Sequence, residues 1–489
     1  MPIPIDCESP ADPGRPAELA FTAALDPRAL LSRLPLADAV LAIASRVLHR
    51  DSLDAIYHEH RGRSFELLLS FEAFVRLIGD ALLEHRGSGR QSFQRADERG
   101  ELPTSVEAVY GKLRRVPVPL SLGFLERGSA SLRELLPDSA AAWVAPACLD
   151  GLNPIILDGK ALKKVAKRLK AARGASGKVS GGKLLVAMDP GSGTVLTMAA
   201  DPDGEANEAR LVPELLPRVA GQVPRHRLWI ADRQFGDPVQ IGRFLEQDGD
   251  HVVVRYDGRT TFHVDPARAA LERRDARGRV VLQDWGWLGA GSNKRRRYVR
   301  RITLIRPGEE SVIIVTDLLE EADYPAADLL EVYLARWGIE RVFQQITEVF
   351  SLARLIGSTP RATIFQAAFC LLLYNMIQAV RACIAEAGPE GCRAEDLSAE
   401  QIFYDVQRQL IAASELIGGT ALAAACRPMG AGELRDWLRG RLAGVWTARW
   451  KKAANREPRR RKPEVGQCHG AHNSVQRLIE HHKARSKPT

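Results

Sequence analysis

The stretch NPIILDG, at residues 153–159, is a short apolar run that ends in an acid. An apolar run of this length, bounded by residues that favour turns, is typical of a buried β-strand. The pattern returns in HRLWIADRQF (226–235), where Asp232 follows the apolar residues as Asp158 does in the first run. We therefore predict two buried strands, each with an aspartate at the point where the chain leaves the sheet.

Further strands and helices are predicted between and after these two strands. They are a hairpin of 183–189 and 194–200, an amphipathic helix at 207–219, a helix at 237–249 and a strand at 251–256. Strands and helices in this order predict a mixed α/β sheet. The hairpin and the first helix provide enough chain to place the two acidic strands side by side. Ligands bind at the rim of such sheets, although either aspartate alone could simply cap the next turn.

A third acid comes from YLARWGIERVFQQITEVF (333–350), which predicts an uninterrupted helix because it has no proline. Tyr333, Arg336 and Glu340 are spaced three and four residues apart, so they share one helical face. A solvated charged face would show the same spacing. If Asp158 and Asp232 converge, however, Glu340 is the candidate that completes a site of carboxylates. Glu348, eight residues further on, is the alternative third acid.

Three converging carboxylates predict a metal site for phosphodiester chemistry. Magnesium prefers oxygen ligands and keeps several waters, so a few carboxylates and a substrate phosphate are enough to hold it. Two such ions about 4 Å apart can activate the attacking oxygen and stabilise the leaving oxygen. The sequence contains no GxxxxGK[ST] loop, HExxH helix or GxSxG turn, which leaves the carboxylates as the strongest catalytic signal.

The distribution of charge points to nucleic acid as the partner. The net charge is +9, and two basic clusters stand out at 294–306, which includes Arg295, Arg296 and Arg297, and at 449–462. The first holds seven basic side chains and no acidic one, and the second holds eight against a single Glu. Clusters of this kind bind phosphate backbones, although either one alone could be a solubilising edge.

Composition predicts a cytoplasmic globular protein. Hydrophobic residues make up 45% of the chain and charged residues 26%. Seven cysteines are scattered without CxxC pairs, so reduced thiols are expected. No charged-then-apolar leader opens the sequence, so we expect no secretory signal. The most apolar stretch, 365–380, contains three amide side chains and is short for a membrane span, which favours a buried core helix.

These patterns divide the chain into six regions. The predicted boundaries are a disordered arm at 1–24, a helical DNA-binding domain at 25–149, the first part of a catalytic core at 150–257, a β-rich insertion at 258–317, the second part of the core at 318–388, and a helical C-terminal region with a basic tail at 389–489. For residues 25–149, generic helical scaffolding fits the pattern nearly as well as DNA binding.

Three motifs together carry a resemblance to a known family. ILDGK contains Asp158, WIADRQF contains Asp232, and YLARWGIE matches a Y-x2-R-x3-E signature that ends in Glu340. The set resembles the DDE transposases of bacterial insertion sequences, in the insertion-sequence-four family that includes the Tn-five and Tn-ten enzymes. The resemblance implies a ribonuclease-H-like α/β core with a β-rich insertion and flanking helical regions. It also implies two Mg²⁺ ions, with Mn²⁺ as an alternative, held by Asp158, Asp232 and Glu340.

The resemblance also implies roles in DNA binding. Tyr333 and Arg336 would hold the terminal phosphates, which a guanidinium can bind through two hydrogen bonds. An aromatic side chain of the insertion would stack on a flipped-out base, and DWGWLG (284–289) offers Trp285 and Trp287. Two tryptophans this close together could instead fill a small core.

Two positions depart from the family pattern. Thr347 stands where the signature has a lysine, and Lys163, Lys164 or Arg341 are candidates to supply the missing phosphate contact. Gln234 stands where the second motif often has a small residue. Neither departure affects the three predicted metal ligands.

The implied function is cut-and-paste transposition of an insertion sequence. The partners would be double-stranded DNA, namely the terminal inverted repeats and the target, and a second copy of the chain in a synaptic dimer. The expected location is the bacterial cytoplasm at the nucleoid, with no membrane and no nucleotide cofactor. The alternatives are a structure-specific nuclease with the same core and a non-catalytic DNA-binding derivative.

Overall fold

The structure is a computed structural model that describes residues 26–64, 66–137, 143–162, 170–174, 179–275, 277–292, 294–306, 308–452 and 473–485. The predicted disordered arm, Lys163, Lys164 and most of the basic run at 449–462 lie outside the described residues.

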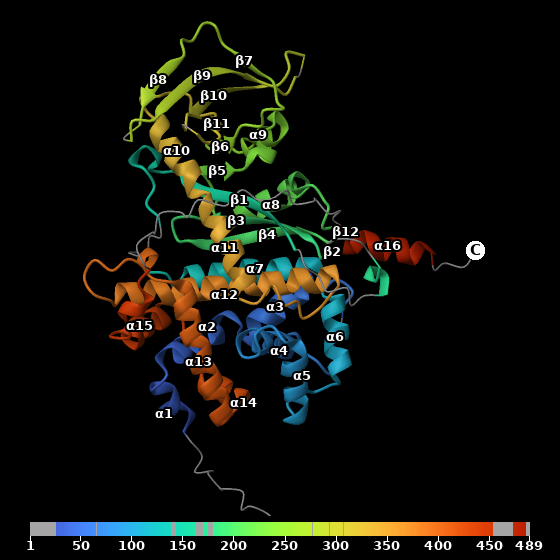
Figure 1. The fold of residues 1–489 in the computed structure, drawn as a ribbon. Coiled ribbons are helices and arrows are strands. Elements are labelled where there is room, and N and C mark those ends of the chain that lie inside the picture. Colours follow the sequence, from blue (N-terminus) through green and yellow to red (C-terminus); the bar gives the residue numbers. More distant parts are fainter. Residues whose placement is uncertain are drawn as a thin grey trace, which may run out of the picture.

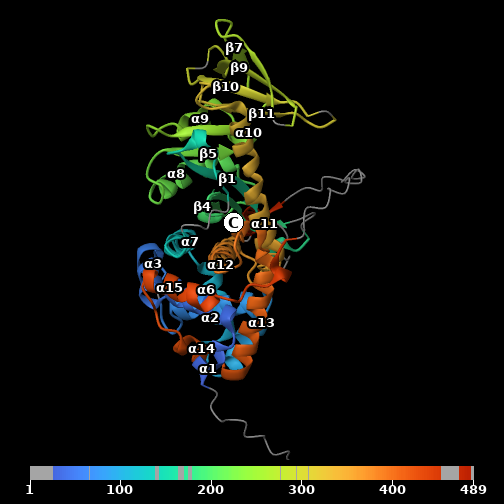
Figure 2. The ribbon, with the colours of Figure 1, turned by 90° about the vertical axis from the view of Figure 1, so that its left-hand side faces the viewer.

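The described chain forms stacked layers (Figures 1 and 2). A mixed sheet occupies the middle and upper part, further helices lie beside it and directly beneath it, and most of the N-terminal and C-terminal helices form the lower end. The N-terminal helices are α1 (Pro27–Ser32), α2 (Pro35–Val47), α3 (Arg50–His60), α4 (Phe71–Leu83), α5 (Gly89–Glu98), α6 (Val106–Arg115) and α7 (Val118–Arg133). The C-terminal helices are α13 (Ala399–Ile417), α14 (Gly419–Ala425), α15 (Ala431–Leu442) and α16 (Val475–Arg485).

Several of the N-terminal helices begin at a serine whose side chain caps the first turn. Ser105 accepts a hydrogen bond from the Ala108 N–H at the start of α6, which satisfies a donor that the helix itself leaves free. Pro119 lies in the first turn of α7, where a missing N–H costs nothing. This region is helical, as predicted, and it packs against α12 and the C-terminal helices rather than standing apart.

The strands form one ten-stranded mixed sheet in the described chain. Its strands are β1 (Asn153–Ala161), β3 (Lys183–Asp189), β4 (Thr194–Asp201), β5 (Arg227–Ala231), β6 (His251–Arg255), β7 (Phe262–Val264), β8 (Leu271–Arg274), β9 (Val280–Leu288), β10 (Arg297–Leu304) and β11 (Val312–Thr316). The order along the sheet is β4-β3-β1-β5-β6-β11-β10-β9-β7, and β8 pairs with β9. A separate parallel pair joins β2 (Val179–Ser180) and β12 (Asn473–Ser474).

The first five strands of this order have the ribonuclease-H-like arrangement. Strands β1, β5 and β6 run parallel, and β3 is antiparallel to both β1 and β4. The β-rich segment continues the same sheet, because β11 pairs antiparallel with β6. The predicted insertion at 258–317 is therefore an extension of the core sheet at its β6 side.

Register places the two aspartates side by side. Ile156 of β1 lies opposite Ile230 of the parallel strand β5, and each aspartate follows two residues later. Side chains two residues apart along a strand share a face, and neighbouring strands are about 4.8 Å apart. Asp158 and Asp232 therefore lie at the same height and on the same face of the sheet. The prediction that each aspartate ends its strand holds for Asp232 but is wrong for Asp158, because β1 continues to Ala161 through its pairing with β3. The predicted adjacency of the two acidic strands is confirmed.

Helices cover both faces of the core sheet. Helices α8 (Val212–Ala220) and α9 (Pro238–Phe244) pack on the face that carries Leu157 and Trp229. The opposite face, with Ile156 and Ile230, packs against α7, α10 (Ala326–Ala335), α11 (Trp337–Glu348) and α12 (Pro360–Glu386). Because the two aspartates share the face of Ile156 and Ile230, they point toward α11.

The prediction of an uninterrupted helix over 333–350 is wrong at Arg336 and at the last two residues, because α11 ends at Glu348. Arg336 separates α10 from α11, although its φ of −51° and ψ of −32° remain helical. The Arg336 N–H donates to the Tyr333 carbonyl, and the Ile339 N–H donates to the Arg336 carbonyl, each at 3.1 Å. These bonds span three residues instead of four, so the turn tightens. The two helices meet end to end along the side of the sheet (Figure 2).

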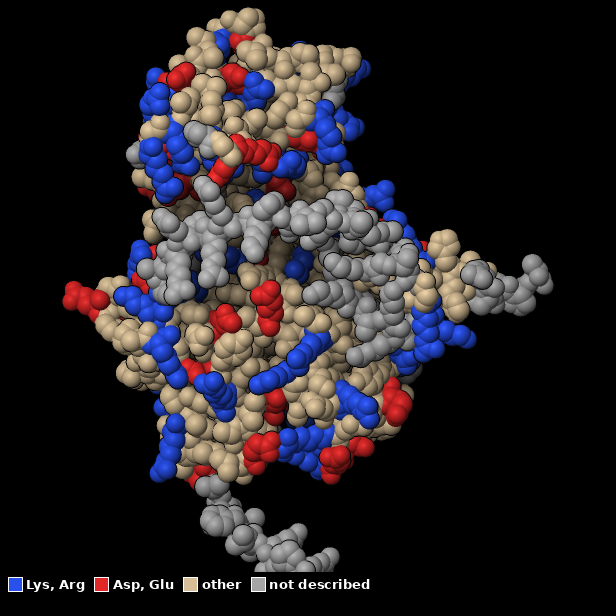
Figure 3. Space-filling view, in the orientation of Figure 1, with Lys and Arg blue, Asp and Glu red and all other residues tan. Residues whose placement is uncertain are grey.

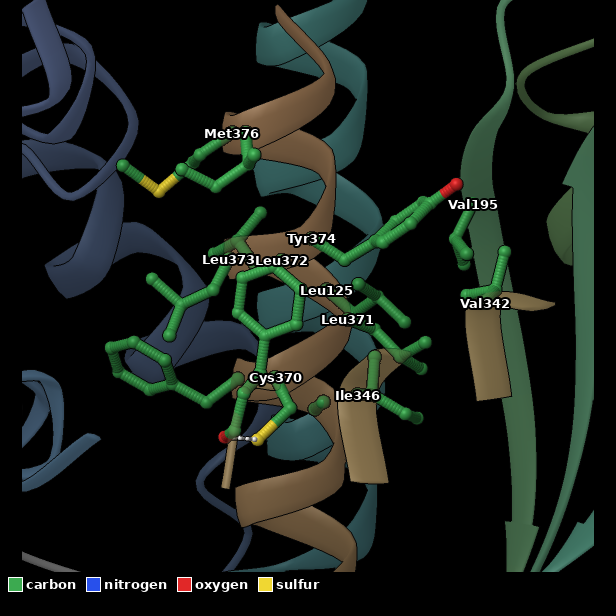
Figure 4. Close-up of a cluster of buried hydrophobic side chains, with 14 of the residues drawn as sticks. Leu125, Val195, Val342, Ile346, Cys370, Leu371, Leu372, Leu373, Tyr374 and Met376 are labelled. Carbon is green, nitrogen blue, oxygen red and sulfur yellow. Dashed lines mark hydrogen bonds between the residues drawn. The ribbon is translucent and has the colours of Figure 1, made fainter. Parts of the chain in front are cut away.

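Helix α12 is the central core helix. It packs against Leu125 of α7, Val195 of β4 and Ile346 of α11 (Figure 4). Asn375 accepts a hydrogen bond from the Val195 N–H and donates to the Val195 carbonyl, which satisfies the free edge of β4. By length and composition α12 would reach across a membrane, but its most apolar window is 100% buried within the protein. The amides predicted to interrupt this stretch are buried with it.

Candidate functional site

An open cleft of about 430 Å³ lies between the ends of β1 and β5 and the side of α11. The three predicted acids, Asp158, Asp232 and Glu340, all line it, together with Arg336. Thr347 and Glu348 also line the cleft, both about two turns beyond Glu340 on α11. The structure thus brings together residues that are up to 190 positions apart in the sequence.

Of the two acids that bond to Arg336, Asp158 is the more buried. Its Oδ1 accepts a hydrogen bond from the Gly159 N–H at 2.9 Å, and its Oδ2 accepts one from Arg336 at 3.2 Å. Burial raises the pKa of Asp158 to about 6, and the negative charges of Asp232 and Glu208 add to this, against the opposing effect of Arg336. Asp158 is therefore a carboxylate held in a site that lacks sufficient positive charge.

Asp232 and Glu340 are held more loosely. Asp232 follows β5 and accepts a hydrogen bond from the Arg233 N–H at 2.6 Å, where it caps a 3-10 helix, η4 (Arg233–Phe235). Glu340 lies in the first turn of α11 and its side chain is 41% exposed. Asp232 thus fulfils the capping role that its sequence position allowed, and it also faces the cleft.

Arg336 bridges two of the acids. Its Nη1 donates to Asp158 at 3.2 Å, its Nη2 donates to Glu340 at 3.0 Å, and its side chain is only 7% exposed. Burial disfavours its charge, but Tyr333, Asp158 and Asp232 together raise the pKa of Arg336. The Tyr333 hydroxyl and the Arg336 Nε are buried. The Tyr333 side chain interacts with Arg336, and of these two residues it is Arg336 that lines the cleft beside the acids.

The donor chemistry of the cleft fits a divalent cation. All three acids present carboxylate oxygens, and the guanidinium of Arg336 supplies the positive charge between Asp158 and Glu340. In this arrangement the described residues contain no group of three His, Cys, Asp or Glu side chains close enough to hold a metal ion. The three acids therefore line one cleft, but Asp158 and Glu340 bond to Arg336 and the acids do not converge on a single point.

Sequence reasoning missed Glu208, which lies beside the cleft. It begins a short 3-10 helix, η3 (Glu208–Arg210), in a segment that the sequence predicts as one amphipathic helix. It accepts hydrogen bonds from Lys183 at 3.1 Å and from Gln234. Lys160 was also missed, and its Nζ lies 5.1 Å from the centre of the Phe343 ring. No local pattern distinguishes either residue, because their partners are distant in sequence.

The two candidate tryptophans have different environments. Trp285 is 1% exposed, and its Nε1–H donates to the Leu319 carbonyl at 2.9 Å. In this conformation it fills a core, which was the alternative interpretation, and has no free face. Trp287 is 37% exposed, and Arg296 lies over its ring at 4.3 Å. Of the pair, Trp287 is therefore the one placed to contact a ligand from solvent.

Only the first part of the basic cluster at 294–306 is exposed, because Arg300 is buried and paired with Glu321, and Arg301 is partly buried and paired with Asp284. Arg295, Arg296 and Arg297 are exposed at the start of β10. Lys and Arg side chains gather on the upper lobe formed by the β-rich extension (Figure 3). The predicted contacts at Lys163 and Lys164 lie outside the described residues, whereas Arg341 is exposed on α11.

Comparison with known proteins identifies the central segment. Residues 151–376 match the family model described as "Transposase DDE domain". No curated protein sequence matches the chain. One similar solved structure is the cryo-EM structure of the piggyBac transposase synaptic complex with hairpin DNA. The match has 11% sequence identity, covers 85% of this chain and 78% of that chain, and has a TM-score of 0.31, which is too low to indicate function.

The matched segment contains β1, β5 and α11, and with them all three acids of the cleft. The family model does not separate the insertion-sequence-four transposases from other DDE transposases, so that finer assignment stays a prediction. Residues 151–376 are thus similar to the transposase DDE domain, and they include every residue that lines the cleft.

Proposed function

We propose that this protein is a transposase that cuts DNA at the terminal inverted repeats of its own insertion sequence and joins the freed ends to target DNA. The observation that supports this most directly is the cleft inside the DDE domain. There, acids from two neighbouring parallel strands and one helix face each other across a buried arginine. Phosphodiester displacement needs groups that position the reactants and neutralise charge, and these residues are of that kind.

Asp158, Asp232 and Glu340 would hold two Mg²⁺ ions, or Mn²⁺ in their place. When bound, the metal supplies an activated attacking oxygen and neutralises charge on the leaving oxygen. Because β1 and β5 fix the two aspartates relative to the sheet, these carboxylates would determine where the cation, and the phosphate that it binds, are held. The raised pKa of Asp158 is consistent with a site that gains from added positive charge.

Arg336 and Tyr333 would bind the phosphates next to the cut. Arg336 is engaged by two acids in this structure, so binding of DNA requires its guanidinium to turn from at least one of them toward the phosphate. The buried Tyr333 side chain lies against the arginine, whose Cζ is 5.8 Å from the tyrosine ring centre. Both side chains come from the α10–α11 junction, so a single local movement would present them together.

The remaining surface would guide the duplex. Arg295, Arg296 and Arg297 would contact the phosphate backbone, and Trp287 would stack on a base beside them. Residues 25–149 and the basic tail within 389–489 would recognise the inverted repeats. We further propose a dimer in the synaptic complex and a location in the bacterial cytoplasm.

The test is cleavage of a labelled duplex that carries the terminal inverted repeat flanking this gene, in Mg²⁺. Wild type is compared with Asp158→Asn, Asp232→Asn and Glu340→Gln. Loss of cutting in each variant, with repeat binding retained, supports the proposal. Glu348→Gln is the matched control, because Glu348 lines the same cleft and was the alternative third acid. Normal cutting by Glu340→Gln and none by Glu348→Gln would reassign the third ligand.

Two outcomes would replace the proposal. Specific binding of the repeat without cutting by wild type would indicate a non-catalytic DNA-binding derivative. Cutting without transfer of the 3′ end to a second duplex would indicate a nuclease. The exposed basic residues and Trp287 on the β-rich extension favour strand transfer, because a hydrolase that releases both products needs no such surface.

A further inference from the structure

Glu208 connects the two segments that carry the aspartates. It follows the helix-capping Asn207, which accepts a hydrogen bond from the Ala209 N–H, so the backbone at this point is fixed. The Glu208 side chain is 12% exposed and points toward the ends of β1 and β5 rather than into solvent. Its partners belong to three different segments, β1, β3 and η4.

The first contact is with Gly159, the residue after Asp158. The Glu208 carboxylate occupies the space that any Cβ at position 159 would need. Glycine at this position therefore allows the carboxylate to lie against the backbone of β1. The same Gly159 N–H donates to Asp158 Oδ1, so the contact is made where the backbone already orients the aspartate.

The second contact is with Gln234, two residues after Asp232. Its Nε2 donates to Glu208 Oε2, while Lys183 donates to Oε1 from the start of β3. A residue with a small side chain at position 234 would not reach Glu208. The structure therefore supplies a reason for the glutamine that departs from the family pattern.

We propose that Glu208 is a positioning residue that clamps the loop after β5 against the end of β1 and so sets the separation of Asp158 and Asp232. This inference rests on the proposed function of the cleft. Both carboxylate oxygens of Glu208 are engaged by donors, so the residue acts through the aspartates and not as a ligand itself. Mutating a residue that holds a metal ligand in place typically lowers metal affinity or activity by about 10–100-fold.

The clamp can be broken and rebuilt. Gln234→Glu places a carboxylate against the Glu208 carboxylate, and Glu208→Ala removes the group altogether. The double variant Gln234→Glu with Glu208→Gln reverses the polarity of the contact, since the new amide donates to the new carboxylate and still accepts from Lys183. Glu205→Gln is the matched control, because Glu205 is exposed three residues away and loses the same charge.

Two readouts are measured for each protein, namely Mn²⁺ affinity of the DNA-free protein by electron paramagnetic resonance and the single-turnover cleavage rate on the repeat duplex. We expect both single variants to weaken Mn²⁺ binding and slow cleavage by about 10–100-fold. The double variant and Glu205→Gln should be close to wild type. Repeat binding and the midpoint of thermal unfolding should change little in every variant, which a purely structural role would not predict.

The outcomes separate the two proposals. Wild-type Mn²⁺ affinity in Glu208→Ala, or failure of the double variant to recover, overturns the clamp. The clamp is also overturned if Mn²⁺ affinity and cleavage rate fall only in variants whose midpoint of thermal unfolding falls. That result would mean that Glu208 acts through the stability of the fold. If wild type binds Mn²⁺ but does not cut, the proposed function fails while the affinity comparison still decides the clamp. A wild type that neither binds Mn²⁺ nor cuts overturns both.

Discussion

Arg336 Nη1 donates to Asp158 Oδ2 across 3.2 Å, which ties the junction of α10 and α11 to the end of β1. The same guanidinium also reaches Glu340, so one cation is shared by two acids of the cleft. A buried carboxylate without a compensating charge is costly, and the arginine offsets that cost. The group proposed to bind DNA is thus also the group that compensates the charge of Asp158 and Glu340.

Replacement of Arg336 should therefore have two effects of opposite sign. Arg336→Gln removes a positive charge next to Asp158 and Glu340, so the DNA-free protein should bind Mn²⁺ about tenfold more tightly. The same variant should cut the repeat duplex more slowly, because a phosphate contact is lost. Isothermal titration with Mn²⁺ and single-turnover cleavage measure the two effects. Arg336→Lys keeps the charge and should show a smaller gain in affinity; equal gains would show that geometry, not charge, limits metal binding.

The raised pKa of Asp158 predicts a dependence of stability on pH. Its pKa is about 6 in the folded state and near its ordinary value of 3.8 in the unfolded state. The folded state therefore binds the proton more tightly, and the free energy of unfolding falls as pH rises from 3.8 to 6. The penalty is complete above that window, so Asp158→Asn should stabilise the metal-free protein at neutral pH by up to about 3 kcal/mol.

Urea denaturation of wild type and Asp158→Asn in EDTA measures this effect. The extra stability of Asp158→Asn should vanish below the ordinary pKa of an aspartate, because Asp158 in the wild type is then protonated in both the folded and the unfolded state. Asp203 provides a control of opposite sign, since hydrogen bonds from Ser474 and Arg477 lower its pKa despite burial. Asp203→Asn should therefore destabilise the protein at neutral pH. An Asp158→Asn variant less stable than wild type at neutral pH would contradict the prediction.

The two acidic strands could be predicted because their signals are local. An apolar run that ends in an acid defines each strand, and the length of chain between them permits the parallel pairing that the structure shows for Ile156 and Ile230. The three-and-four spacing of Tyr333, Arg336 and Glu340 likewise follows from helical geometry alone. Convergence of the acids in one cleft is a consequence of these few features.

Other features depend on contacts that no local pattern encodes. Glu208 reaches Gln234 across 26 positions, and its own segment carries the pattern of an amphipathic helix. Continuation of the sheet through β11 depends on pairing with the edge of β6, and alternation of apolar residues does not specify a partner strand. The irregular turn at Arg336 also escapes prediction, because the nearby Gly338 is tolerated within a helical pattern and does not by itself mark a break.

The two tryptophans of the β-rich extension should separate stability from DNA binding. Trp285→Ala removes a buried indole and its hydrogen bond to Leu319, so the free energy of unfolding should fall by about 3–5 kcal/mol. Trp287→Ala should leave stability nearly unchanged but weaken binding to a repeat duplex with one unpaired terminal base by about 1–3 kcal/mol. A fully paired duplex is the control. Equal weakening on both duplexes would remove base stacking as the role of Trp287.

The exposed run at the start of β10 gives a prediction for ionic strength. Each phosphate neutralised by an arginine releases about 0.9 counterions, so binding weakens as salt rises. Replacing Arg295, Arg296 and Arg297 with alanine should reduce the slope of log affinity against log salt by up to about 3. Because backbone contacts carry no sequence information, the reduction should be the same on the terminal repeat and on an unrelated duplex.

Fluorescence anisotropy over a series of salt concentrations measures the slope. The matched control removes three exposed arginines from the β8–β9 hairpin of the same extension, Arg273, Arg274 and Arg277. If β10 faces DNA, the first triple variant changes the slope and the second does not. If both triple variants change the slope equally, the β-rich extension acts on DNA through its overall charge. Counterion release would then depend on the electric field of the extension rather than on contacts with particular phosphates. An unchanged slope in the first variant would place this run away from DNA and leave the α10–α11 junction as the main phosphate contact.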